Sequence, residues 1–117
     1  MFRFENMEIW QEAILLSNDL FDVADEIESK KLYRFAEQLR GAALSISNNI
    51  AEGSGSFSDK EFGYFLNVAR RSTFECANLM FVFHLRKLIT EERKLHYLER
   101  LEILAKKITN FRKALNL

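Results

Sequence analysis

The chain has 117 residues, of which 48% are hydrophobic and 29% are charged. This length suits a single domain spanning residues 1–117, with a core that needs no disulfides. The apolar fraction excludes a disordered chain, and the absence of proline favours long helices over a turn-rich β fold.

The net charge is zero, but its distribution is uneven. Residues 1–28 hold eight acidic residues and one basic residue, whereas residues 29–117 hold sixteen basic and nine acidic ones. Three interpretations are open: solvated helix faces, oppositely charged helices that lie side by side, or a basic part that faces a polyanion.

The single cysteine, Cys76, excludes a disulfide framework and fits a reducing compartment. Its apolar neighbours favour a buried thiol over a nucleophile. The N-terminus has no apolar signal-peptide core, and no apolar run approaches the ~18 residues of a membrane span. We therefore expect a cytoplasmic protein without membrane contact.

The first two predicted helices cover residues 7–28 and 30–52, with Ser29 as a candidate N-cap of the second. The second helix carries a heptad seam at Leu32, Phe35, Leu39, Ala42, Ile46 and Asn49. Gly53-Ser54-Gly55 then predicts a helix stop, because glycine readily takes the left-handed conformation. An anion-binding turn before the next helix is the other interpretation of these glycines.

The third predicted helix extends from Ser58 to about residue 88. Glu61 completes a Ser-x-x-Glu capping box, and Phe57 with Phe62 fits a hydrophobic staple. Apolar residues outside its main seam are Phe74, Phe81, Val82, Leu85 and Leu88. They predict either an innermost helix or a subunit interface on its outer side.

Thr90 is expected to cap the fourth helix, which extends to about residue 115. The short connections make consecutive helices antiparallel neighbours. The fold class is therefore all-α, an antiparallel up-down-up-down four-helix bundle. Helices of this length give a rod of roughly 33–45 Å.

Polar residues interrupt the predicted apolar seams or flank them, at Asn49, Glu52, Gly53, Ser72 and Glu75. A buried, hydrogen-bonded asparagine that fixes register is favoured over a ligand-binding role. Ser45 and Ser47 are expected to bond back to carbonyls of their own helix.

No catalytic, metal or cofactor site is predicted. Glu52 and Glu75 lack the Glu-x-x-His spacing of carboxylate di-iron bundles, and no phosphate loop or nucleophile elbow is present. Neither His84 nor His96 has an arginine at the Arg-x₄₋₆-His spacing of helical-bundle nucleases. We expect no enzyme and no small-molecule substrate.

Basic residues, mostly in doublets, recur along the third and fourth predicted helices. They are Arg70, Arg71, Arg86, Lys87, Arg93, Lys94, Lys106, Lys107, Arg112 and Lys113. Solvated faces explain such doublets, but an oligomer would multiply them into a surface for phosphates. Exposed stacking aromatics are not evident, so sequence-specific reading of single strands is not expected.

One stretch of the chain resembles a known family. It comprises Gln38-Leu39-Arg40, Ala42-Ala43-Leu44-Ser45-Ile46 and Asn49-Ile50-Ala51-Glu52-Gly53. A second block adds Phe62, Phe65-Leu66, Ala69-Arg70, Ser72 and Glu75, and the early Ile9-Trp10-Gln11 and Ala13 also match. These residues are similar to those of four-helix-bundle proteins encoded in intervening sequences of bacterial 23S ribosomal RNA genes.

The resemblance covers essentially the whole chain and implies an antiparallel four-helix bundle, often a homopentamer, without a known reaction. Where the family often has proline and glycine, this chain has Ser47 and Arg71. Accessory proteins of diversity-generating retroelements look similar in fold, and they bind nucleic acid and a reverse transcriptase. We therefore expect a non-enzymatic homo-oligomer that binds RNA, DNA or a nucleoprotein, with a protein–protein adaptor as the alternative.

Overall fold

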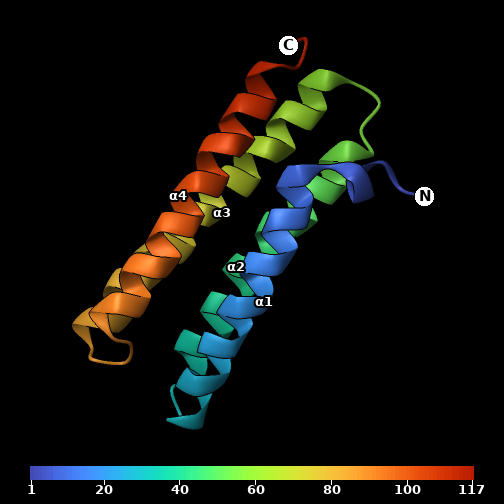
Figure 1. Ribbon diagram of the computed structural model, residues 1–117. Coiled ribbons are helices and arrows are strands. Elements are labelled where there is room, and N and C mark those ends of the chain that lie inside the picture. Colours follow the sequence, from blue (N-terminus) through green and yellow to red (C-terminus); the bar gives the residue numbers. More distant parts are fainter.

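The computed structural model describes residues 1–117 as four helices preceded by one short 3₁₀ helix. These elements are η1 (Arg3–Asn6), α1 (Glu8–Ser29), α2 (Tyr33–Ser54), α3 (Asp59–Leu85) and α4 (Glu91–Lys113). Consecutive helices run antiparallel, which confirms the predicted four-helix bundle (Figure 1). The molecule is 44 Å long, within the predicted range.

The helices pack in chain order. α2 lies along α1 and α3, α3 lies along α4, and α1 makes only a smaller contact with α4. One apolar core runs through the bundle, with Phe62, Phe83 and Met80 fully buried in it. No helix combines the length and apolar character that crossing a membrane requires.

The two predicted caps at the start of α3 and α4 are confirmed. The Ser58 side chain accepts a hydrogen bond from the Glu61 N–H, and the Thr90 side chain accepts one from the Arg93 N–H. The predicted staple is wrong, because Phe57 is fully exposed while Phe62 is buried. Phe62 packs instead on Phe111 of α4, at a ring separation of 5.6 Å.

Ser29 does not cap α2. It is the last residue of α1, and its hydroxyl donates to the Glu26 carbonyl. The chain leaves α1 through Lys31, whose φ of 64° is left-handed. The Lys31 N–H bonds the Glu28 carbonyl and the Leu32 N–H bonds the Ile27 carbonyl, the pattern of a Schellman motif. Because this turn uses three residues, α2 begins at Tyr33.

α3 ends in the same way, through Lys87 with φ 62°. The Lys87 N–H bonds the His84 carbonyl and the Leu88 N–H bonds the Phe83 carbonyl. This turn ends α3 at Leu85, before the predicted residue 88. Both positions with positive φ are lysines, and no glycine has a positive φ.

Gly53 therefore does not stop α2 in the predicted way. It is a buried residue of the last helical turn, and the helix continues to Ser54. A Cβ at Gly53 would lie 2.7 Å from the Phe65 Cβ and 2.8 Å from Phe62 Cδ1. Glycine is needed here because α2 and the start of α3 approach closely.

Candidate interaction surface

The polar stretch at the end of α2 forms a link between two helices. The Ser72 hydroxyl of α3 donates to the Ser45 hydroxyl of α2 at 2.8 Å, and Asn49 Nδ2 donates to the Ser45 hydroxyl and carbonyl. The Ser45 hydroxyl thus accepts bonds from two side chains, and the predicted bond to a carbonyl of its own helix is wrong. Ser47 does bond back, to the Leu44 carbonyl.

Asn49 is half-buried rather than part of the apolar seam. Leu39, Ala42 and Ile46 of the predicted seam are buried, and Ala36, Ala43 and Ile50 are buried beside them. Ile50 therefore occupies the core position predicted for Asn49. The contact that joins the helices is Ser45–Ser72, which matches a structural role for this stretch.

Glu52 and Glu75 are exposed on the surface and form no ion pair. No three His, Cys, Asp or Glu side chains lie close enough together to hold a metal ion. Cys76 is buried, as predicted. Burial, reinforced by the neighbouring Glu75 carboxylate, raises the pKa of the Cys76 thiol to about 12.

Four acidic residues of α1 are paired with basic residues of α4. Lys107 Nζ lies 2.8 Å from Glu8 and 2.6 Å from Glu12, and Arg93 lies 2.6 Å from Glu26. Arg100 pairs with Asp19 in the same way. These contacts confirm that oppositely charged helices lie side by side, and they lower the pKa of Glu8.

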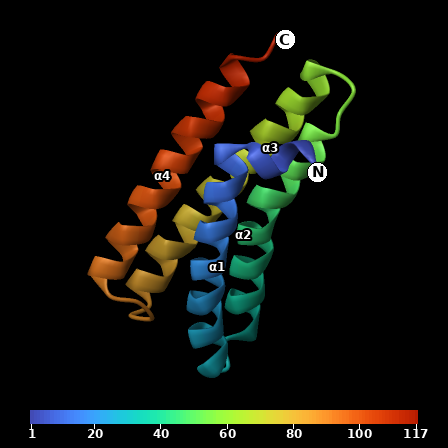
Figure 2. The ribbon, with the colours of Figure 1, turned by 45° about the vertical axis from the view of Figure 1, so that its right-hand side comes forward.

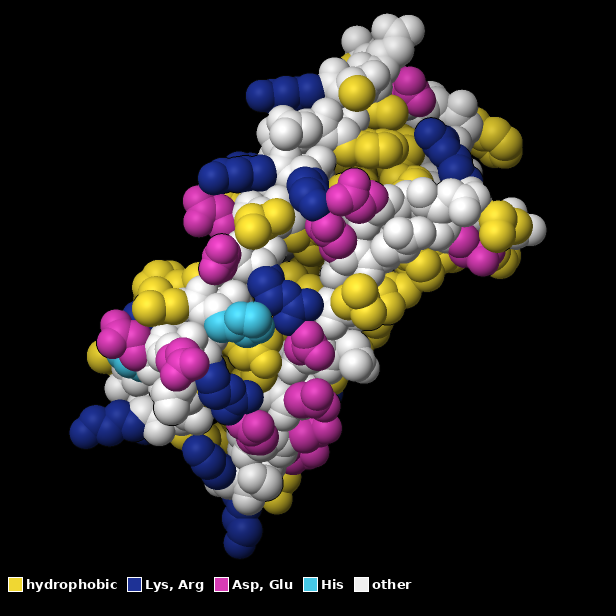
Figure 3. Space-filling view, in the orientation of Figure 1, with side chains coloured by type: hydrophobic (Ala, Val, Ile, Leu, Met, Phe, Trp, Pro, Cys, Tyr) yellow, Lys and Arg dark blue, Asp and Glu magenta, His cyan; other side chains and the backbone are white.

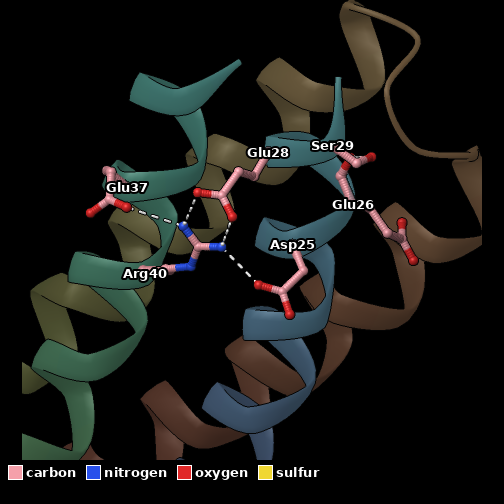
Figure 4. Close-up of polar contacts among 6 residues, drawn as sticks. All are labelled: Asp25, Glu26, Glu28, Ser29, Glu37 and Arg40. Atoms are coloured by element: carbon pink, nitrogen blue, oxygen red, sulfur yellow. Dashed lines mark hydrogen bonds and ion pairs between the residues drawn. The ribbon is translucent and has the colours of Figure 1, made fainter. Parts of the chain in front are cut away.

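Arg40 of α2 pairs with two further carboxylates of α1. Figure 4 shows its guanidinium among the carboxylates of Asp25, Glu28 and Glu37, with Glu26 pointing away. The contact with Asp25 is 2.7 Å and that with Glu28 is 3.0 Å. The hydrogen bonds to Glu28 and Asp25 raise the pKa of Arg40. Arg40 belongs to the recognised sequence block, and its observed role is to join α1 to α2.

The ten predicted nucleic-acid-binding residues do not form one surface. Figure 3 shows basic side chains spread along the visible face, with acidic ones between them. Three of the ten form ion pairs. Arg93 and Lys107 pair with carboxylates of α1, and Lys106 pairs with Glu102 of its own helix. Arg112 donates to the Gly63 carbonyl at 2.9 Å.

Two more of the ten lie over aromatic rings of α3. The Arg70 guanidinium is 4.8 Å from the Phe74 ring centroid, and Lys94 Nζ is 5.2 Å from that of Phe81. The remaining four form no ion pair, side-chain hydrogen bond or ring contact, and all are exposed. They are Arg71, Arg86, Lys87 and Lys113.

A groove of about 720 Å³ runs between α3 and α4 on their outer side. Its floor is apolar, with Phe74, Phe81 and Leu101, and Arg70 and Lys113 line it as well. Phe74 and Phe81 are each more than half exposed, and Leu85 and Leu95 add to the same exposed apolar set. Of the off-seam residues, Phe74, Phe81 and Leu85 are exposed, so α3 is not buried on all sides, whereas Val82 and Leu88 are half-buried against the core.

The family model described as 23S rRNA-intervening sequence protein matches residues 5–110. No curated protein matches the chain.

Proposed function

Because the chain belongs to the 23S rRNA-intervening sequence protein family, we propose that it is a non-enzymatic binding module. In this proposal several copies of the chain assemble through the outer face of α3 and α4, and the assembly binds nucleic acid or a nucleoprotein. The reducing cytoplasm is its proposed location, consistent with the free thiol of Cys76.

The single observation that carries self-assembly is the exposed apolar surface of α3 and α4. Phe74 is 57% exposed and Phe81 is 54% exposed beside the groove, although other phenylalanines of α3 are buried in the core. Contiguous exposed apolar residues of this kind mark contact sites rather than ordinary solvated surface. A second copy would cover the phenylalanines and leave the charged edges at the rim.

Support for nucleic-acid binding comes from the basic residues that the fold leaves unpaired. The bases facing α1 are neutralised, so they contribute little to attraction of a polyanion. Arg71, Arg86, Lys87 and Lys113 remain available, and each copy in an assembly would add another set.

A fluorescence-anisotropy titration with labelled RNA and DNA, repeated at several salt concentrations, tests this proposal. Phosphate contacts predict binding at ~50 mM salt that weakens linearly on a log–log plot as salt rises. Absence of binding at ~50 mM salt, or binding that does not respond to salt, would reject the phosphate-contact mechanism.

The groove also favours a second candidate, a protein–protein adaptor that takes an amphipathic partner helix. This candidate predicts a protein that co-purifies in a fixed ratio. It also predicts that the wild type does not bind nucleic acid, and neither does the variant in which Lys106 and Lys113 are replaced by alanine. Both forms should bind the partner protein.

A further inference from the structure

The two turns that follow α1 and α3 lie at the same end of the bundle in both ribbon views (Figure 1, Figure 2). The side chain of Lys30 in the first turn reaches the Leu88 carbonyl in the second, at 3.5 Å. Five exposed basic residues without an ion pair gather here, and we name them the turn-end cluster. They are Lys30, Lys31, Arg34, Arg86 and Lys87.

The acidic residues at this end cancel the charge of the turn-end cluster only in part. Glu26 is engaged by Arg93, and Glu28 is engaged by Arg40. Arg40 is shared with Asp25 and Glu37, so these three carboxylates keep two negative charges. With Glu91 and Glu92, in the first turn of α4, four negative charges stand against the five bases of the cluster. Figure 3 shows Lys and Arg side chains projecting from this lower end of the molecule.

Two members of the cluster occupy positions where glycine would be less strained. Lys31 and Lys87 are the C′ residues of two Schellman motifs, at φ 64° and 62°. Glycine is the usual residue at this position, because its lack of a Cβ removes the steric penalty of the left-handed region. Strain of this kind concentrates at functional sites, and here it places a lysine at the tip of each turn.

An exposed aromatic ring lies within the cluster. Tyr33 is 58% exposed, and it lines a shallow hollow of about 320 Å³ together with Lys31 and Arg34. Aromatic rings among basic residues stack unpaired bases, whereas bases in a duplex are already stacked on each other. Tyr33 is thus an exposed aromatic ring beside basic residues, the arrangement that stacking on a base requires.

We propose that the turn-end cluster is the binding site for single-stranded nucleic acid. Phosphates contact Lys30, Lys31 and Lys87 across the two turns, and one base stacks on Tyr33. The inference rests on the proposed function, since it names the surface and the strand form that such binding would use.

The test compares two double variants of the full chain, each lacking two positive charges. Lys31→Gly with Lys87→Gly removes cluster charge and relieves the left-handed strain, so its melting temperature should equal or exceed the wild-type value. Lys60→Ala with Lys106→Ala is the matched control, because Lys60 lies at the start of α3, away from the cluster, and Lys106 is paired with Glu102. The probes are a single-stranded RNA, a single-stranded DNA of the same sequence, and the corresponding DNA duplex.

The expected result is that the glycine variant binds both single strands about tenfold more weakly, with a salt slope reduced by about 1.4, while the control stays within about twofold of wild type. Tyr33→Ala should weaken single strands about fivefold and leave the duplex unchanged. The single strand that wild type binds more tightly, RNA or DNA, identifies the ligand.

Three outcomes would overturn the inference. If wild type binds and the glycine variant binds equally well, the site lies elsewhere while the proposed function stands. If both variants lose affinity equally, or the duplex binds more tightly than the single strands, the cluster is not the specific site. If wild type binds none of the three probes, the inference fails together with the nucleic-acid part of the proposed function.

Discussion

Gly53 of α2 packs so closely on α3 that a Cβ at this position would lie 2.7 Å from the Cβ of Phe65. The Phe65 Cβ is fixed to the backbone, so it moves only if the helix moves. This contact sets how closely the ends of α2 and α3 approach. It also explains why the Asn49–Gly53 segment ends in a glycine, whose role is to allow close helix packing.

Gly53→Ala is therefore expected to destabilise the bundle by about 1–3 kcal/mol, the usual cost of overpacking. Gly41→Ala is the matched control, because nothing lies within 4 Å of a Cβ there. Alanine at that exposed helical site should stabilise by about 0.5–1 kcal/mol. Urea unfolding measures both, and equal effects of the two substitutions would contradict the close-packing interpretation.

The contact of Glu8 with Lys107 predicts a specific acid dependence of stability. The Lys107 ammonium lowers the pKa of Glu8 in the folded protein. The stabilisation is therefore present above the ordinary pKa of about 4.5 and is lost as the pH falls through the lower folded value. Glu8→Gln should show a smaller drop in melting temperature between about pH 5 and about pH 3 than wild type.

Glu52→Gln provides the control for this measurement, because Glu52 is exposed and unpaired. Its melting temperature should follow the wild-type pH curve. If Glu8→Gln and Glu52→Gln behave alike, the Glu8–Lys107 contact does not contribute to folding in solution.

Cys76 should be inert in the folded protein. Burial keeps its thiol protonated, with a pKa of about 12 compared with an ordinary value of 9.0. Alkylation by iodoacetamide near pH 8 is expected to require unfolding, so the rate should rise sharply in urea. Rapid alkylation of the native protein at a rate independent of urea would show that this thiol is accessible.

The raised pKa of Cys76 also affects the folding stability at alkaline pH. Unfolded chains lose the Cys76 proton above about pH 9 while folded chains retain it, so this group lowers stability as the pH rises toward 12. Cys76→Ala should make the decline in stability between these pH values shallower. An unchanged slope would mean that the thiol titrates equally in both states.

Self-assembly through α3 and α4 is tested by measuring the molecular mass of the protein in solution. Light scattering of the wild-type chain at micromolar concentration should give a multiple of 13.8 kDa. Replacing Phe74 and Phe81 by serine should shift the mass toward the monomer without loss of helix, since both rings are exposed. Phe57→Ser is the control, because Phe57 is exposed outside this face, and its mass should match wild type.

Much of the fold could be predicted from the sequence because its signals are local. Apolar spacing located all four helices, and Ser58 and Thr90 marked two helix starts through side-chain caps. The ends of α1 and α3 were less well placed, because Lys31 and Lys87 carry no sequence signal for a left-handed turn. That signal is normally a glycine.

The candidate site was harder to predict, because pairing depends on helix rotation. Lys107 and Lys106 look equivalent in the sequence, yet only Lys107 faces α1 and is neutralised by it. At the end of the α2 seam, Asn49 is similarly only half-buried, and its neighbour Ile50 is in the core instead. The Lys30-Lys31 doublet was overlooked because it lies outside the third and fourth helices, although it is visible in the sequence.

Sedimentation velocity of the full chain mixed with fluorescently labelled single-stranded RNA tests the proposed function most directly. At ~50 mM salt, the label should sediment with a multimer of the 13.8 kDa chain, and raising the salt to ~200 mM should release it. The proposal would be contradicted if the label sediments as free RNA at the lower salt concentration, or if it sediments with a monomer.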